Sequence, residues 1–221
     1  MMRPRPTPGT SMTTPRTSSL TLLALLCAVS LTSCNVFDRD APTDAYFLLA
    51  PAAQPKVDGA KLGSVVLRRA SVVRPFGERG FVYKLSNGQW RIDAYNGFLA
   101  DPIDMITDAL LRDFDSSGRF TFVAGAGIVT ATDFAAEVLV EEFFTDFTDP
   151  AKGVAVVSLR AYLVDRRTER GGVHCTLLGT GRVPLHNGSP MAVAEALSAA
   201  TAQAIAGVVS SLPASTAPTA P

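Results

Sequence analysis

The sequence is poor in the side chains that most often bind metal or carry catalysis. It holds two histidines and three cysteines in 221 residues. Cys27 lies in an apolar N-terminal run and Cys34 follows that run closely, so Cys175 is the only cysteine in the rest of the chain. One thiol excludes an intramolecular disulfide, and together with two histidines it excludes the multi-cysteine zinc patterns. We therefore expect no metal and no cofactor.

Acidic residues are missing from the first 34 positions, which contain Arg3, Arg5 and Arg16. An apolar run from Leu20 to Leu31 comes next and leads directly into small residues. About 12 apolar residues are too few to span a bilayer, which needs roughly 20. A basic start, a short apolar run and small residues are typical of an export signal.

The tetrapeptide Leu31-Thr32-Ser33-Cys34 resembles the bacterial lipobox. The resemblance implies that Cys34 is lipidated, that the chain is cut before it, and that acyl chains such as palmitate hold the protein on a membrane. Residues 1–33 would then be a signal peptide and residues 34–44 a lipidated tether. The alternative is an ordinary export signal with an incidental cysteine.

The chain after the signal has the length of a single domain and a small excess of acidic residues. Three of the 20 basic residues and none of the 20 acidic ones precede Cys34, so the remainder carries a net charge of −3. This charge argues against nucleic acid as a partner. We expect one domain at 45–212. A Pro/Ala/Ser/Thr tail at 213–221 is too polar to order itself.

Periodicity places strands in the first half of the domain. Tyr46–Leu49 and Leu62–Val73 read as strands. Segments 81–86 and 89–94 alternate apolar and polar residues around Asn87-Gly88, which predicts a hairpin with a two-residue type I′ turn. Its register would pair Leu85 with Trp90.

Two helices and four further strands complete the pattern. Asp101-Pro102 and Ser189-Pro190 each supply a favoured cap followed by proline at the first helical position. Apolar residues at helical spacing follow each cap. The predicted strands between the helices are Phe120–Val123, Glu137–Phe147, Val154–Asp165 and Gly172–Leu185. The order strands-helix-strands-helix predicts an α+β fold with two principal helices on a mainly antiparallel sheet.

Few residues are candidates for catalysis. His174 falls on the polar face of a strand, which predicts an exposed side chain, and His186 lies in a turn. Cys175 has apolar neighbours by alternation, which favours a buried thiol over a nucleophile. Gly125-Ala126-Gly127 lacks the third glycine of a dinucleotide turn. We expect no catalytic residue and no enzymatic activity.

The segment from Glu141 to Asp149 is the best candidate for a binding surface. Glu141 and Glu142 are adjacent on a strand and should point to opposite faces, which argues against an acid pair unless a bulge intervenes. Phe143, Phe144 and Phe147 fall on both faces of the same strand. They are either sheet core or a surface that binds lipid or a partner.

Several motifs occur together in an order that resembles one family. Tyr46-Phe47-Leu48-Leu49-Ala50-Pro51 starts the domain, and Phe81-Val82-Tyr83 follows. The other three are Tyr95-Asn96-Gly97-Phe98-Leu99-Ala100-Asp101-Pro102, Ser117-Gly118-Arg119-Phe120 and Ala161-Tyr162-Leu163-Val164-Asp165, before the Ala-rich helix. This order is similar to that of the ABC-type transport auxiliary lipoproteins, the group that includes the paraquat-inducible lipoprotein C type. Phe98 departs from the tryptophan of many members.

The resemblance implies a role beside an ABC transporter with a periplasmic subunit of the mammalian-cell-entry (MCE) type. Such systems move phospholipids or other apolar molecules between membranes, and the lipoprotein serves as the docking or receiving component. Asn35 is compatible with the periplasmic face of the outer membrane. A homo-oligomer, a stand-alone lipid carrier and a structural envelope lipoprotein remain open alternatives.

Overall fold

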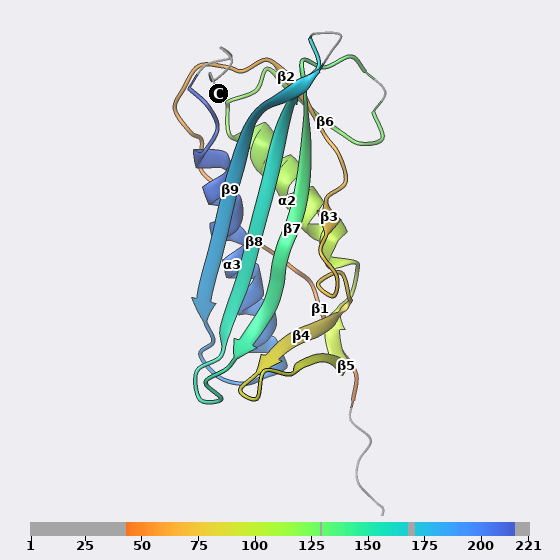
Figure 1. Ribbon diagram of the computed structural model, residues 1–221, viewed down its shortest axis with the longest axis vertical. Coiled ribbons are helices and arrows are strands. Elements are labelled where there is room, and N and C mark those ends of the chain that lie inside the picture. The colour runs from red at the N-terminus through yellow and green to blue at the C-terminus, as the bar shows by residue number, and fades with distance from the viewer. Residues whose placement is uncertain (1–42, 129, 168–170, 215–221) are drawn as a thin grey trace, which may run out of the picture. The chain divides into compact units, whose positions relative to one another are not determined.

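The computed structural model describes residues 43–128, 130–167 and 171–214 as one domain. Figure 1 shows three long strands side by side in front of two helices. The long strands are β7 (Phe134–Phe147), β8 (Val154–Asp165) and β9 (Gly172–Pro184), and the helices are α2 (Pro102–Ser116) and α3 (Pro190–Ser210). The predicted α+β class and element order are confirmed.

Six shorter strands complete a mixed sheet. The long pairings β7–β8 and β8–β9 are antiparallel, as is the hairpin β4–β5. One edge of β7 is covered along its length by β8, and the other pairs in succession with β2, β3 and β4, all parallel to it. The short strands are β1 (Ala45–Phe47), β2 (Ser64–Leu67), β3 (Ser71–Val72), β4 (Gly80–Leu85), β5 (Trp90–Phe98) and β6 (Phe122–Gly125).

The predicted strand boundaries hold best for the long strands. Val154–Asp165 is confirmed as β8. The predicted strand Leu62–Val73 is instead two short strands, β2 and β3, each with its own stretch of β7. The first strand begins and ends earlier than expected, and β6 starts later than Phe120. Short strands take their limits from the partner strand, which periodicity does not contain.

The β4–β5 hairpin differs from the predicted two-residue turn. Lys84 lies opposite Trp90, and the Leu85 N–H donates to the Gln89 carbonyl at 2.8 Å, which leaves a three-residue loop at 86–88. Gly88 has φ +79°, the left-handed conformation that closes such loops. The predicted pairing of Leu85 with Trp90 is wrong by one residue.

Both helices start where the sequence predicts. The Asp101 carboxylate accepts the Ile103 N–H at 2.8 Å, and the Ser189 hydroxyl accepts the Ala192 N–H at 3.2 Å. Each helix then has proline in its first turn. These bonds satisfy donors that the first helical turn leaves unpaired.

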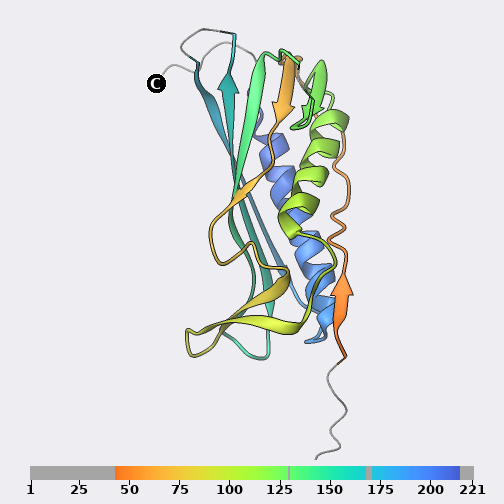
Figure 2. The ribbon, with the colours of Figure 1, turned by 90° about the vertical axis from the view of Figure 1, so that its right-hand side faces the viewer.

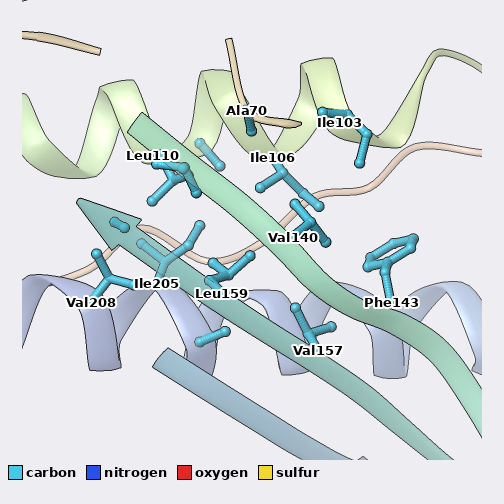
Figure 3. Packing of buried hydrophobic residues seen from close by; sticks show 14 of the residues in the cluster. Ala70, Ile103, Ile106, Leu110, Val140, Phe143, Val157, Leu159, Ile205 and Val208 are labelled. Atoms are coloured by element: carbon cyan, nitrogen blue, oxygen red, sulfur yellow. The ribbon is translucent and has the colours of Figure 1, made fainter. Parts of the chain in front are cut away.

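The core lies between the sheet and the helices. Figure 2 shows the sheet as one layer and the helices as the other. Figure 3 shows Ile106 and Leu110 of α2 and Ile205 of α3 pointing toward Val140 and Leu159 of the sheet. All five side chains are fully buried. By length and composition α3 could cross a membrane, but 67% of its apolar window is buried inside the domain, where it serves as a core helix.

Glycines let α3 lie unusually close to β9. A Cβ on Gly179 or Gly181 would come within 1.9 Å of the Ala204 or the Ala200 carbonyl oxygen, respectively. Only a residue without a side chain fits such an approach. The small side chains of the Ala-rich α3 and the two strand glycines together make this close packing possible.

Candidate docking groove

The segment after β1 runs along the outer side of the two helices, away from the sheet (Figure 2). Its backbone is tied to both helices. The Ala50 N–H donates to Ser198 Oγ of α3 at 3.1 Å, and Arg112 Nη2 of α2 donates to the Pro51 carbonyl at 3.1 Å. These bonds fix the position of the segment along both helices.

An apolar groove lies between the first half of α3 and the chain formed by β1 and this segment. Its volume is about 560 Å³. Tyr46, Leu48 and Met191 form its rim and are 52%, 63% and 54% exposed. Further lining residues are Phe47, Ala50, Ala52, Ala194, Glu195, Ser198 and Ala199. Large apolar side chains gathered in one exposed place make the groove a candidate contact surface.

The groove has few polar side chains that could bind a ligand from its interior. Ser198 Oγ accepts the Ala50 N–H and donates to the Ala194 carbonyl at 2.8 Å. Glu195 is solvated at the edge, where one carboxylate oxygen lies 3.9 Å from His186 Nδ1. The groove therefore favours an apolar ligand that needs few hydrogen bonds.

The sequence prediction did not find this groove. Tyr46 and Leu48 alternate with Phe47 and Leu49, so both faces of the segment are apolar. Leu49 is buried, whereas Leu48 is not. Periodicity distinguishes two faces only when one of them is polar.

The three phenylalanines that the sequence assigns either to the sheet core or to a binding surface lie among other aromatic rings. Phe143 and Phe144 are buried, 3% and 5% exposed, on opposite faces of β7, and Phe147 is half-buried. Burial assigns the first two to the packing of the domain. Their ring contacts are Phe143 with Phe98 at 5.6 Å, Phe144 with Trp90 at 4.9 Å and Phe147 with Tyr83 at 5.6 Å between centroids.

The prediction that His174 is exposed is wrong. A β-bulge makes His174 the extra residue of β9, because Cys175 pairs with Leu163 and Val173 with Val164. The bulge turns Val173 to solvent and buries His174, whose ring centroid lies 5.4 Å from that of Phe134. His174 Nε2 has no hydrogen-bond partner among the described residues.

Cys175 is half-buried, and burial raises the pKa of its thiol. A raised pKa lowers the fraction of thiolate, which is the nucleophilic form. The residue has the apolar neighbours that the sequence predicted, but it is half-buried where a buried thiol was expected.

A second bulge changes the acidic segment. Glu141 is the extra residue of β7 between Val140 and Glu142. Its carboxylate accepts a hydrogen bond from Arg160 Nε at 2.6 Å. Arg160 lies on the outer face of β8, as does Ser158, which is the partner of Glu142. Both glutamates therefore share the outer face, and the prediction of opposite faces is wrong. Over the described ranges, no group of three or more His, Cys, Asp or Glu side chains could hold a metal ion.

Comparison with known proteins supports the fold. No protein-family model and no curated protein matches the sequence. A DUF330 protein from Xanthomonas campestris has a similar structure, with a TM-score of 0.66, 19% identity, and coverage of 75% of this chain and 92% of that one. An uncharacterized protein matches with a TM-score of 0.56, 15% identity, and coverage of 77% of this chain and 99% of that one. At these identities the likeness establishes a shared fold.

Cys34 and most of the predicted tether lie outside the described residues, as does the end of the predicted tail. The described chain begins at Thr43 and enters β1 two residues later, beside the groove.

Proposed function

We propose that this protein is a lipid-anchored docking subunit of an ABC transport system with an MCE-type periplasmic component. Lipid on Cys34 would hold it at the periplasmic face of the outer membrane. There it would receive the MCE subunit and the phospholipid or other apolar cargo that this subunit carries. The proposal includes no enzymatic activity and no cofactor.

One observation carries the proposal: the chain enters the domain beside an open apolar groove. Thr43 lies nine positions after Cys34, and a fully extended chain of this length spans at most about 30 Å. A lipid on Cys34 would keep the groove within that distance of the bilayer. The motif order of the sequence and the α+β domain behind a short tether support the same role.

The filled interior argues against the alternative of a lipid carrier that encloses an acyl chain between sheet and helices. Side chains of both helices and the sheet meet there in direct contact (Figure 3). A protein interior packed in this way leaves no room for a ligand. The groove beside α3 instead offers apolar surface on the outside of the domain.

Recovery of the partner from native membranes tests the proposal. The full-length chain with a C-terminal tag is cross-linked in its native envelope and purified, and an MCE-domain subunit is expected among the captured proteins. The Cys34→Ala variant serves as control and should lose both membrane attachment and the partner. Deletion of the gene should weaken the outer-membrane barrier to detergents.

Efficient capture from native membranes that never contains an MCE subunit would overturn the proposal. Captured proteins of another envelope machine would favour a structural lipoprotein instead.

A further inference from the structure

The groove beside α3 has the lining that an unbranched hydrocarbon chain requires. It is lined by small side chains, among them Ala50, Ala194 and Ala199, and by the large apolar side chains of Leu48 and Met191, which are more than half exposed. An open lining of alanine methyl groups and large apolar side chains favours a hydrocarbon chain over a polar ligand. Its volume of about 560 Å³ is typical of sites for small ligands.

Polarity gives a second reason for an apolar occupant. The Ser198 hydroxyl is used by the Ala50 N–H and the Ala194 carbonyl. A ligand with buried polar groups would leave them without partners, at a cost in affinity. A hydrocarbon chain has no such groups, and each buried methylene is favourable.

The length of chain outside the domain identifies where that hydrocarbon would come from. A lipid on Cys34 ties the groove to the membrane through a tether of at most about 30 Å. Tethering over such a distance gives effective concentrations in the millimolar range. A shallow open groove with weak intrinsic affinity is then sufficient to hold a membrane lipid.

We propose that this groove binds one acyl chain of a membrane phospholipid. The inference rests on the proposed function, because lipid anchoring supplies the proximity. It adds a site for the cargo class on the docking subunit itself, formed by the segment after β1 and the first half of α3.

Fluorescence quenching tests the site in the mature chain from Cys34 to Pro221 with Cys34→Ala, which carries no lipid of its own. Trp90 is the single tryptophan, so Trp90→Phe removes the background. Leu48→Trp then places a probe in the groove. Leu178→Trp is the matched control, because Leu178 is similarly exposed, at 51%, on the outer face of β9. Vesicles of phosphatidylcholine brominated along the acyl chains supply the quencher, at lipid concentrations up to the millimolar range that the tether would provide.

Strong quenching at position 48 and little at position 178 is expected. Met191→Glu should lower the apparent affinity for the vesicles about tenfold, since it places a charge where the acyl chain would contact the methionine side chain. Leu178→Glu should leave the affinity unchanged. Because Trp90 packs on Phe144, each variant is checked by thermal unfolding. The quenching is also measured with Trp90 retained, as the increase that Leu48→Trp or Leu178→Trp adds to the quenching of Trp90 alone.

Equal quenching at both positions, or none at position 48, overturns the inference. Recovery of an MCE subunit from membranes together with absent quenching would refute the groove while the proposed function stands. Quenching without any MCE partner would refute the function and leave the groove in place. Loss of quenching on adding the purified MCE subunit alone would show competition for the same apolar site and support the groove.

Discussion

Two regions of this domain differ in whether their aliphatic side chains are buried or exposed. Along β8 and α3 they are fully buried, as at Leu159 and Val208. Around β1 and the start of α3 they stand in water, as at Leu48 and Met191. The first region supplies the stability of the fold. The second exposes apolar area that contributes little to stability and is free to contact a ligand.

The largest expected loss of stability comes from a substitution that disrupts the close approach of α3 to β9. Gly181→Val places a Cβ where only 1.9 Å separates it from the Ala200 carbonyl oxygen, so the helix must shift. We expect the free energy of unfolding to fall by more than about 4 kcal/mol, measured by urea denaturation of the unlipidated mature chain. Gly188→Ala, where a Cβ meets no atom within 4 Å, should change it by less than about 0.5 kcal/mol. Comparable losses for both variants would contradict the packing described here.

Truncation of one leucine in each region tests the comparison directly. Leu159→Ala should lower the free energy of unfolding by about 3 kcal/mol, because it leaves a cavity in the core. Leu48→Ala should lower it by less than about 0.5 kcal/mol, since Leu48 is 63% exposed. Denaturant titrations of the two variants under identical conditions provide the measurement. If Leu48→Ala were as costly as Leu159→Ala, the groove would be part of the core.

The start of α3 belongs to both regions and gives a smaller effect. Ser189→Ala removes the acceptor of the Ala192 N–H and should cost about 1 kcal/mol of stability. Ser189→Asp restores an acceptor and should recover most of the loss. Thermal unfolding of the three proteins measures the difference. Equal stability of the alanine and aspartate variants would exclude a capping role.

The smallest expected effect is the change of stability with pH that Asp165, at the end of β8, produces. A hydrogen bond from Arg167 lowers the pKa of Asp165 to about 2, below the value near 3.9 of an unfolded chain. The charged carboxylate therefore stabilises the fold above about pH 4, and this contribution is lost as the pH falls toward about 2. The gain is below about 1 kcal/mol because the pair is partly solvated. Urea denaturation between about pH 5 and about pH 2 should show a shallower decline for Asp165→Asn, and parallel curves would contradict the assignment.

The sequence predicted the elements whose signals are local. Both helix starts are confirmed at Asp101 and Ser189, because a cap and a following proline act within one turn. β8 is confirmed over Val154–Asp165, since it pairs on both sides and alternates cleanly. Local signals of this kind depend little on the rest of the fold.

The errors lie where one extra residue changes the register. The bulges at His174 and Glu141 and the three-residue loop before Gln89 each shift a strand by one position. A shift by one exchanges the two faces of a strand, so His174 becomes buried and Glu141 joins Glu142 on the outer face. Bulges depend on how neighbouring strands fit together, and alternation in one strand cannot predict them.

The sequence by itself determined the two helices, the long strands and the α+β class, because caps and periodicity act over a few residues. It also contains the lipobox that predicts a lipid on Cys34. Only the tertiary structure decided which apolar residues are left outside. Leu48 is as apolar as the buried Leu49 beside it. It lines an open groove because hydrogen bonds to α2 and α3 fix the segment that carries it, with one face against the helices and the other toward solvent.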